Sequence, residues 1–414
     1  MVQSMLYDVI TQQKNERDKL LTADYIPRNE KVNIESGLIN VIIGPRRAGK
    51  SFFGHHSLKN RNYGYVNFDD ERLLQFNNFD EILSAVNAVY NNPEILFFDE
   101  IQNKPNWELF VNRLHRIGKK VVLTGSNSNL LSGEFSTHLT GRNYIINIFP
   151  LSFNELINIS ESKGELVQKE LLNTLLEFGG YPEVITKSIE PKEYLKMLFR
   201  DTIYKDLVLR YKPRDPVMIH KIASMLVSNT GCETSIRNLS ALVKYNNRTV
   251  SKFLSYLLNT MIFFQIPKFS YKVKEQLSSN KKSYVIDNGF INSVGYSASP
   301  NEGKKFENFT AIELFRRTIS QGKRLFYWKK EYEVDFVIQK GETVEKLIQV
   351  CVDIENPKTI SREKRALLEA SKLLRCNNLT IITKNYSAID SFEWYGLTRE
   401  IRFVRIIDWL SGKV

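Results

Sequence analysis

Apolar runs of strand length alternate with mixed polar segments over roughly the first third of the chain. The segments between the runs are long enough for helices, and this alternation is typical of parallel strands joined by right-handed crossovers. The expected strands lie at 38–43, 63–68, 94–98, 119–124 and 143–149. The run before Asp99 has no polar break, as expected of a parallel strand buried on both faces. The pattern predicts an α/β fold with a parallel sheet, preceded by a polar helix over about 5–20.

The pattern changes after this predicted sheet. Helical periodicity dominates from 151 to about 212, where Ser152 and Glu155 match a capping box. At 213–290 an amphipathic helix precedes two helices that turn near Asn246, and two strands around a basic loop follow. The apolar positions that suit a shared helix-turn-helix core are Leu239, Leu242, Val243, Val250, Phe253, Leu254 and Leu257. This order is typical of a winged helix.

From about 300 to the end, the pattern is again that of alternating helices and strands. Helices are expected at 306–317 and 360–374, and strands at 324–329, 333–338, 346–352 and 379–383. We therefore predict four domains, at 1–150, 151–212, 213–295 and 296–414.

A complete G-x-x-x-x-G-K-[ST] loop lies between the first expected strand and a segment that can start a helix, which is the context that this motif requires. The loop consists of Gly44, Pro45, Arg46, Arg47, Ala48, Gly49, Lys50 and Ser51. Its glycines let successive N–H groups face a triphosphate at a helix N-terminus. Lys50 can reach the outer phosphates, and the Ser51 hydroxyl can bind Mg²⁺. The sequence predicts a nucleoside triphosphate site that uses Mg²⁺.

Two further strands end in polar residues that we expect beside this loop. Asp99 would hold Mg²⁺, directly or through water, and Glu100 would polarise the attacking water. The doubled acid favours hydrolysis over a pure nucleotide-dependent switch. Ser126 or Asn127, at the end of the following strand, would orient water against the γ-phosphate.

Arg142, just before the last expected strand, is a candidate arginine finger. A planar, permanently charged guanidinium suits the phosphate charge of the transition state. Arg116 and Arg200 are weaker candidates for this role.

The composition is that of an ordinary soluble globular protein, with 42% hydrophobic and 25% charged residues. The net charge of +12, from 58 basic and 46 acidic residues, favours a polyanionic partner, above all nucleic acid. Three cysteines without paired spacing indicate neither a disulfide framework nor a zinc site. Because no apolar run approaches about 18 residues and the N-terminus lacks a signal-peptide layout, we expect a cytoplasmic protein without a membrane partner.

The predicted winged helix offers a DNA-binding surface. The residues that would open its recognition helix and meet DNA are Asn247, Arg248, Thr249, Ser251 and Lys252. Lysines of the basic loop, namely Lys268, Lys272, Lys274, Lys281 and Lys282, would contact phosphates. The alternative is a helical protein–protein module with a solvated basic loop.

The motifs in this order resemble the archaeal and bacterial AAA+-like ATPases that carry a C-terminal restriction-endonuclease-like domain. The resemblance is carried by the phosphate loop, Phe-Phe-Asp-Glu at 97–100, Leu-Thr-Gly-Ser at 123–126, Leu-Thr-Gly-Arg at 139–142 followed by Pro-Leu-Ser-Phe-Asn-Glu, and Glu-Val-Asp-Phe-Val-Ile at 333–338. It covers nearly the whole chain. It implies ATP hydrolysis, assembly into a ring or dimer, and a role that involves DNA. The helical stretch at 151–212, broken at Gly179-Gly-Tyr-Pro182, is by its pattern the expected place for a lid over the nucleotide.

In nucleases of that C-terminal fold, a helix Glu, a strand Asp and a Glu-x-Lys on the next strand assemble a metal site. Glu307 and Asp335 match the first two residues, but the third position is Gln349 and a cysteine replaces the lysine. A neutral amide is a weaker Mg²⁺ ligand than a carboxylate, and a thiol cannot replace an ammonium group. Asp353, two residues on, is expected to face the same side of the strand as Cys351 and Gln349, where it could partly replace the missing carboxylate. We expect a degenerate scaffold that binds DNA or a partner without cutting.

The sequence therefore predicts an ATP-hydrolysing, Mg²⁺-dependent motor or remodelling protein that acts on duplex or branched DNA and assembles into a homo-oligomer. Two alternatives remain open at this point. One is a nucleotide-controlled signalling switch whose helix-turn-helix binds protein. The other is an ATP-dependent nuclease in which the altered C-terminal site still works.

Overall fold

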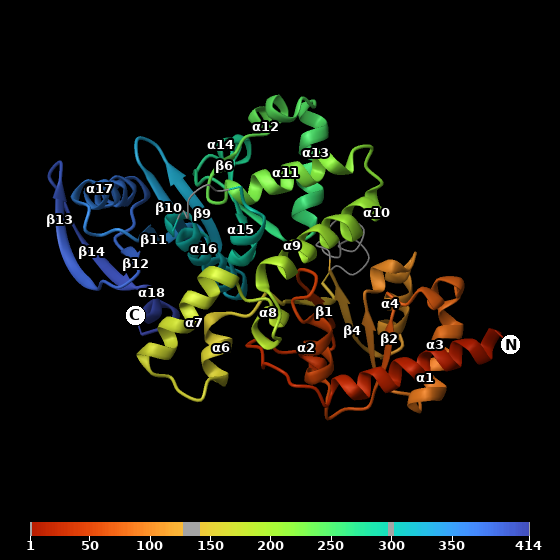
Figure 1. The fold of residues 1–414 in the computed structure, drawn as a ribbon. Coiled ribbons are helices and arrows are strands. Elements are labelled where there is room, and N and C mark those ends of the chain that lie inside the picture. Colours follow the sequence, from red (N-terminus) through yellow and green to blue (C-terminus); the bar gives the residue numbers. More distant parts are fainter. Residues whose placement is uncertain (1, 127–140, 297–301, 414) are drawn as a thin grey trace. The chain divides into compact units, whose positions relative to one another are not determined.

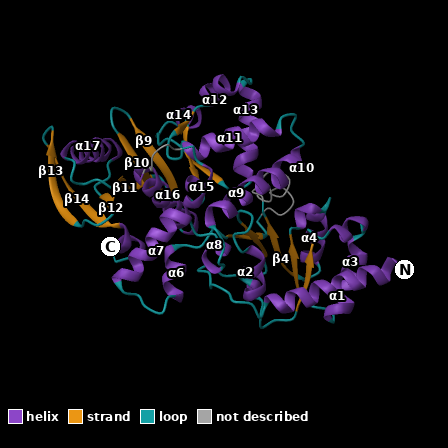
Figure 2. Cartoon of the chain, viewed as in Figure 1, coloured by secondary structure: helices purple, strands orange, loops and turns teal. Residues whose placement is uncertain are grey.

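The structure is a computed structural model that describes residues 2–126, 141–296 and 302–413 (Figures 1 and 2). The backbone packs into two compact units. The first comprises Met1–Leu151 and Asn259–Met261, and the second comprises Ser152–Leu258 and Ile262–Val414.

The first unit is built on a parallel five-stranded sheet in the order β2-β3-β4-β1-β5. Its strands are β1 (Ile39–Ile43), β2 (Tyr63–Asn67), β3 (Ile95–Asp99), β4 (Lys120–Gly125) and β5 (Asn143–Asn147). Its α-helices are α1 (Val2–Leu20), α2 (Lys50–Ser57), α3 (Phe79–Tyr90) and α4 (Trp107–Arg116), joined by short 3₁₀ turns at Ile34–Ser36, Glu71–Gln75 and Ile101–Asn103. The predicted α/β core with a parallel sheet is confirmed, and each strand lies within one residue or two of its expected bounds.

Burial follows the position of each strand in this sheet. Every residue of β1 and β3 is buried, as parallel strands covered on both faces require. The edge strand β5 instead exposes Tyr144 and Ile145 to 44% and 40%. The polar helix α1 packs beside α3 and against β2 (Figure 1).

The second unit begins with a helical segment. Its helices are α6 (Phe153–Ile159), α7 (Glu165–Phe178), α8 (Pro182–Thr186), α9 (Pro191–Thr202) and α10 (Leu209–Tyr211), with a π-helical turn at Ile203–Val208 between the last two. The predicted capping box is present, since the Ser152 and Glu155 side chains each bond the other's backbone N–H.

The turn between α7 and α8 is fixed from a distance by Asp287. Its carboxylate accepts hydrogen bonds from the backbone N–H of Gly180 at 2.7 Å and of Gly289 at 2.9 Å. Gly179 has a φ of 77°, and a Cβ there would lie 1.7 Å from an Asp287 oxygen. A glycine is therefore required at this position.

The next segment contains the helices and the three short strands expected of the predicted winged helix, an assignment that stays a prediction. It comprises α11 (Pro216–Ser228), β6 (Glu233–Thr234), α12 (Ile236–Val243), α13 (Asn247–Asn259), β7 (Phe263–Ile266), α14 (Val273–Ser278), β8 (Lys281–Val285) and α15 (Asn288–Val294). The strands form a three-stranded antiparallel sheet in the order β6-β8-β7. One predicted core residue is wrong: Leu242 is 69% exposed, because the inward face of α12 carries Ser240 and Val243.

The C-terminal part is a mixed six-stranded sheet in the order β13-β14-β12-β11-β10-β9, with α17 lying across it (Figure 1). Its elements are α16 (Glu302–Ser320), β9 (Arg324–Lys329), β10 (Glu333–Lys340), β11 (Thr343–Cys351), α17 (Pro357–Leu374), β12 (Leu379–Thr383), β13 (Ala388–Trp394), β14 (Leu397–Arg405) and α18 (Ile406–Leu410). The hairpin β13–β14 was not predicted. Its burial alternates along the chain, and its turn at Tyr395 and Gly396 uses two positive φ angles.

Candidate active site

The phosphate loop joins the end of β1 to the start of α2, as the motif requires. Gly49 precedes the helix with a φ of 94°, and Arg47 adopts a left-handed φ of 63°. A Cβ added at Gly44 would lie 1.9 Å from the carbonyl oxygen of Ile148. The backbone approaches so closely here that only glycine fits.

Lys50 is held inside the loop. Its side chain is 5% exposed, and its Nζ donates hydrogen bonds to the carbonyl oxygens of Gly44 at 3.1 Å and Pro45 at 3.0 Å. The nearest carboxylate oxygen, Oε1 of Glu100, is 3.9 Å away. The ammonium group is thus positioned at the loop by contacts that phosphate oxygens can replace.

Asp99 is surrounded by hydroxyl groups at the end of β3. Thr124 of β4 and Tyr65 of β2 hydrogen-bond its carboxylate, the Tyr65 hydroxyl at 3.1 Å, and the Ser51 hydroxyl of the loop also acts on it. Burial and the neighbouring charge of Glu100 raise its pKa, which the Thr124 and Ser51 hydroxyls and Lys50 oppose. The positive charge of a divalent cation at this carboxylate would offset the cost of burying its negative charge.

Glu100 stands at the tip of β3 with a φ of 51°. Its backbone N–H donates to the Thr124 hydroxyl at 3.0 Å, and its Oε2 accepts from the Ser126 hydroxyl at 3.1 Å. The Gln102 amide donates to the same Oε2. The structure therefore brings together predicted residues from the ends of two strands, β3 and β4, and from the loop, and it adds Thr124 of β4 and Tyr65 of β2.

The remaining loop residues differ in their surroundings. Pro45 and Ala48 are buried, Arg47 is exposed, and Arg46 lies 3.9 Å from Asp69. The guanidinium of Arg28 donates to the carbonyl oxygens of Ala48 and Phe149, which ties the segment before β1 to the loop. Arg28 was not predicted as a site residue, because no motif in the sequence marks it.

Arg142 is exposed, and its backbone carbonyl accepts a hydrogen bond from Ile39 at the start of β1. The phosphate loop follows the opposite end of β1, five residues later, so about 16 Å of strand separates the two. Arg142 therefore cannot reach the phosphates of its own chain. Arg116 and Arg200 are exposed, and Asn127 lies outside the described residues.

The site contains the side chains that a magnesium–triphosphate needs. Ser51 and Asp99 would hold the metal, and Lys50 would bind the outer phosphates. Across the described ranges no group of three or more His, Cys, Asp or Glu is arranged to hold a metal ion by itself. Mg²⁺ commonly takes one or two carboxylates and completes its shell with phosphates and water, so this arrangement fits it.

The predicted recognition helix is α13, and it begins at Asn247 as expected. Asn247, Arg248, Ser251 and Lys252 are exposed, whereas Thr249 is half-buried. Lys272 and Lys274 are exposed on and beside α14. Two observations differ from the prediction that the basic loop contacts phosphates. Phe269 in the loop is buried, and its backbone N–H donates to the carbonyl oxygen of Tyr327 in β9 at 2.7 Å. The Lys282 side chain is only 4% exposed, so it does not face a DNA partner as predicted.

Glu307, Asp335 and Gln349 do meet in space, between α16, β10 and β11. The Gln349 Oε1 accepts the backbone N–H of Asp335 at 2.6 Å, and Lys282 lies 3.3 Å from Glu307 and 3.6 Å from Asp335. Burial and the charge of Glu307 raise the pKa of Asp335. Asp353 is exposed past the end of β11, where its carboxylate accepts from the N–H of Glu355.

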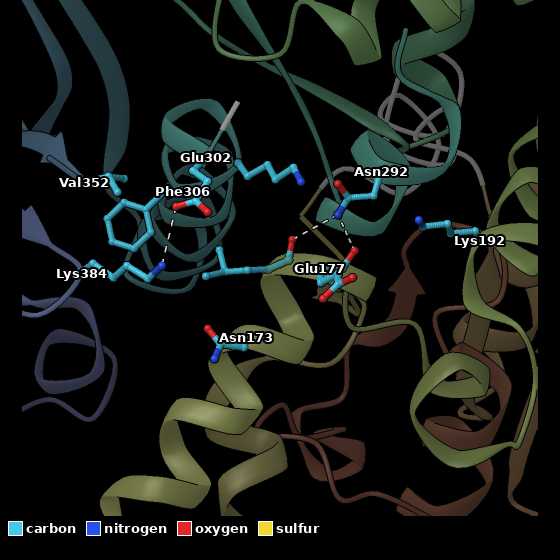
Figure 3. A pocket seen from close by; sticks show the side chains of 10 residues that line it. Asn173, Glu177, Lys192, Asn292, Glu302, Phe306, Val352 and Lys384 are labelled. Atoms are coloured by element: carbon cyan, nitrogen blue, oxygen red, sulfur yellow. Dashed lines mark hydrogen bonds and ion pairs between the residues drawn. The ribbon is translucent and has the colours of Figure 1, made fainter. Parts of the chain in front are cut away.

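A separate pocket of about 440 Å³ opens in the second unit (Figure 3). Three lysines and two glutamates line it, and Lys384 pairs with Glu302 at 3.7 Å. The Asn292 amide closes one side by donating to the backbone of α7. None of the predicted site residues lines this pocket.

Comparison with known proteins identifies relatives over most of the chain. A model described as an AAA domain matches residues 36–157, and one described as a domain of unknown function (DUF8612) matches residues 169–300. The uncharacterized protein MJ1544 of Methanocaldococcus jannaschii is 36% identical over 386 residues, which cover 88% of this chain and 86% of the relative. The chain belongs to the family of MJ1544. An uncharacterized protein of Haemophilus influenzae is 28% identical over 403 residues, covering 91% and 95% of the two chains.

Solved structures of lower similarity include two P-loop ATPases. The Walker-type ATPase of Pyrococcus abyssi is 15% identical with a TM-score of 0.40. The match covers 66% of this chain and 99% of the ATPase. The RuvB Holliday junction branch migration motor of Thermotoga maritima is 16% identical with a TM-score of 0.27, over 62% and 90% of the chains. Scores of this size carry no information about activity or partners.

The AAA match spans the phosphate loop and the acidic end of β3. Together with the parallel sheet, it makes the first unit an AAA+-like P-loop ATPase fold. Both family matches end before the C-terminal sheet, so the restriction-endonuclease-like assignment of that sheet stays a prediction. Within the described part of the chain, no helix is long and apolar enough to span a membrane.

Proposed function

We propose that this member of the MJ1544 family is an ATP-hydrolysing, Mg²⁺-dependent motor or remodelling protein that acts on DNA. The observation that carries the proposal is the convergence of Lys50, Ser51, Asp99 and Glu100 at one end of the parallel sheet. Lys50 binds the outer phosphates and Ser51 and Asp99 hold Mg²⁺, while Glu100 accepts a proton from the attacking water.

The Ser126 hydroxyl supports this assignment because it bonds Glu100 directly at 3.1 Å. When the γ-phosphate is present, the Glu100–Ser126 pair borders the space where water must attack. We propose that Ser126 orients this carboxylate and senses the γ-phosphate. Asn127, the other residue predicted for this role, remains a candidate from the sequence alone.

The position of Arg142 supports the proposal of a homo-oligomer. An arginine at the edge of the sheet opposite the phosphate loop can complete a phosphate site only in a neighbouring copy. We propose that Arg142 acts in trans within a homo-oligomer, a ring or a dimer, so that hydrolysis depends on assembly.

The DNA-binding proposal rests on charge at the helix-turn-helix. Residues 234–274 contain seven Lys or Arg and no Asp or Glu. Arg248 and Lys252 are exposed one turn apart near the start of α13, where a recognition helix meets base edges and phosphates. Lys272 and Lys274 add charge on the connection between β7 and β8. A stretch of chain with this excess of basic residues favours a polyanion over a neutral protein partner.

We further propose that the C-terminal sheet is a degenerate restriction-endonuclease-like domain that does not cut DNA. Support comes from the meeting of Glu307, Asp335 and Gln349 at equivalent places in helix and strands. Gln349 supplies an amide where a metal site needs a carboxylate.

The test is ATP hydrolysis measured with no DNA and with single-stranded, duplex and four-way DNA. We expect stimulation by DNA, and DNA affinity that falls steeply as salt rises from about 50 to 200 mM. Lys50→Ala should abolish turnover. Arg248→Ala with Lys252→Ala should weaken DNA binding, while the exposed Lys372→Ala on α17 serves as the matched control. An ATP hydrolysis rate that is the same without DNA and with each of the three forms of DNA would favour the signalling switch.

A further inference from the structure

The amino group of Lys282 lies among three carboxylates from two other elements. Its Nζ is 2.6 Å from Glu333, 3.3 Å from Glu307 and 3.6 Å from Asp335, and its side chain is 4% exposed. Glu333 and Asp335 come from β10 and Glu307 from α16, whereas Lys282 belongs to β8. One strand of the winged-helix module therefore delivers a cation to the nuclease-like cluster.

The oxygen atoms that a metal ion would need are already engaged. Asp335 Oδ2 accepts the backbone N–H of Val350 at 3.0 Å, and Oδ1 faces Lys282. Glu307 Oε1 accepts the Tyr284 hydroxyl at 2.8 Å in addition to the lysine contact. Each of these two carboxylates thus already has hydrogen-bond or ion-pair partners inside the protein.

Gln349 is engaged as well and cannot turn toward a cation without losing hydrogen bonds. Its Oε1 accepts from Asp335 N, and its Nε2 donates to the carbonyl oxygen of Glu333 and to the Glu363 carboxylate. Glu363 in turn pairs with Arg362 at 2.6 Å. An amide held in this way is a weaker metal ligand than a carboxylate, so the residues present do not fit a divalent cation while Lys282 lies among the three carboxylates.

We propose that the ammonium group of Lys282 is the resident cation of this cluster, occupying the place of the divalent metal ion and making the C-terminal domain a metal-free scaffold. The buried ammonium supplies one positive charge among the three carboxylates, where a divalent ion would supply two. The same contacts clamp β8 to α16 and β10. The proposal concerns the C-terminal sheet and does not depend on ATP hydrolysis.

The first experiment measures Mn²⁺ binding to the nucleotide-free full chain by electron paramagnetic resonance. Wild type and Asp335→Asn are compared, and we expect both to bind the same amount of Mn²⁺. Because this comparison cancels any Mn²⁺ held near Asp99, it reports on the cluster alone. A Mn²⁺ site that is present in wild type and lost in Asp335→Asn would overturn the proposal, as would Mg²⁺- or Mn²⁺-dependent DNA cleavage abolished by the same substitution.

The second experiment removes the ammonium group. Lys282→Met keeps the aliphatic stem and leaves three carboxylates facing one another, so the variant should bind one more Mn²⁺ per chain than wild type. Mn²⁺ should also raise its melting temperature, at concentrations about tenfold below any effect on wild type. Lys281→Met, on the exposed face of the same strand, is the matched control and should behave like wild type.

A folded Lys282→Met that gains no Mn²⁺ would overturn the idea that the lysine fills a metal position. If Lys282→Met does not fold, the wild-type comparison with Asp335→Asn decides by itself. ATP turnover of the wild type is read in a separate assay, so a failed motor hypothesis and a failed cluster hypothesis give different results.

Discussion

Thr124 is the residue on which the geometry of the catalytic acids depends most directly. Its hydroxyl donates to Asp99 and accepts the backbone N–H of Glu100 at 3.0 Å, and the side chain is fully buried. Thr124→Val keeps the shape and removes both hydrogen bonds. The change therefore leaves a buried carboxylate oxygen and a buried N–H without these partners.

The expected loss of stability follows from these two bonds. A hydrogen bond to a charged group contributes about 1.5–3 kcal/mol, and a buried donor left unpaired costs about 1–3 kcal/mol. Since the two losses share one hydroxyl, we expect a combined destabilisation of about 3 kcal/mol. For a unit of roughly 150 residues this lowers the melting temperature by about 6–12 °C. The Thr124 bond also lowers the pKa of Asp99, so its removal raises that pKa and weakens metal binding.

Calorimetry of the nucleotide-free protein measures this shift, and a non-hydrolysable ATP analogue with Mg²⁺ identifies the transition of the ATPase unit. Thr124→Ser is the control, because it keeps the hydroxyl and loses one methyl group worth about 1 kcal/mol. ATP turnover should fall about tenfold or more in Thr124→Val and much less in Thr124→Ser. If the valine variant melts within about 2 °C of the serine variant, the hydroxyl does not hold the two acids and the reasoning fails.

Three further predictions concern catalysis, assembly and pH. Glu100→Gln should retain ATP and lower kcat by about 10²–10⁴, measured by filter binding and single-turnover hydrolysis; normal hydrolysis would remove Glu100 from its role. Arg142→Ala mixed with Lys50→Ala should regain activity at shared sites, and no recovery by assembled mixtures would count against a finger in trans. Burial raises the pKa of Asp287 from 3.8 to about 7. Between these two values the folded state holds a proton that the unfolded state releases, so the stability of the folded state falls as pH rises from about 4 to about 7. The unfolding free energy of wild type relative to Asp287→Asn should decline over this window by up to roughly 4 kcal/mol, whereas a difference independent of pH would contradict the titration.

The sequence was sufficient to predict those structural features that are formed by residues close together in the chain. The phosphate loop, the acidic end of β3 and the capping box at Ser152 depend on spacing within a few residues, and all were found where predicted. The strands of the first unit were predictable because strands buried on both faces are continuously apolar. The hairpin β13–β14 was not predicted, because its half-exposed strands alternate polar and apolar residues in a segment without a motif.

By itself the sequence determined a parallel-sheet P-loop fold and the place of the phosphate loop in it, and it predicted the phosphate-binding residues and a basic helix-turn-helix. Only the tertiary structure revealed that Thr124 and Tyr65 hold Asp99, that Arg28 bonds the phosphate loop, and that Lys282 is buried among carboxylates instead of facing solvent. Such contacts join residues that are tens of positions apart. Their partners are chosen by strand order and packing, and no pattern along the chain encodes which buried charge meets which.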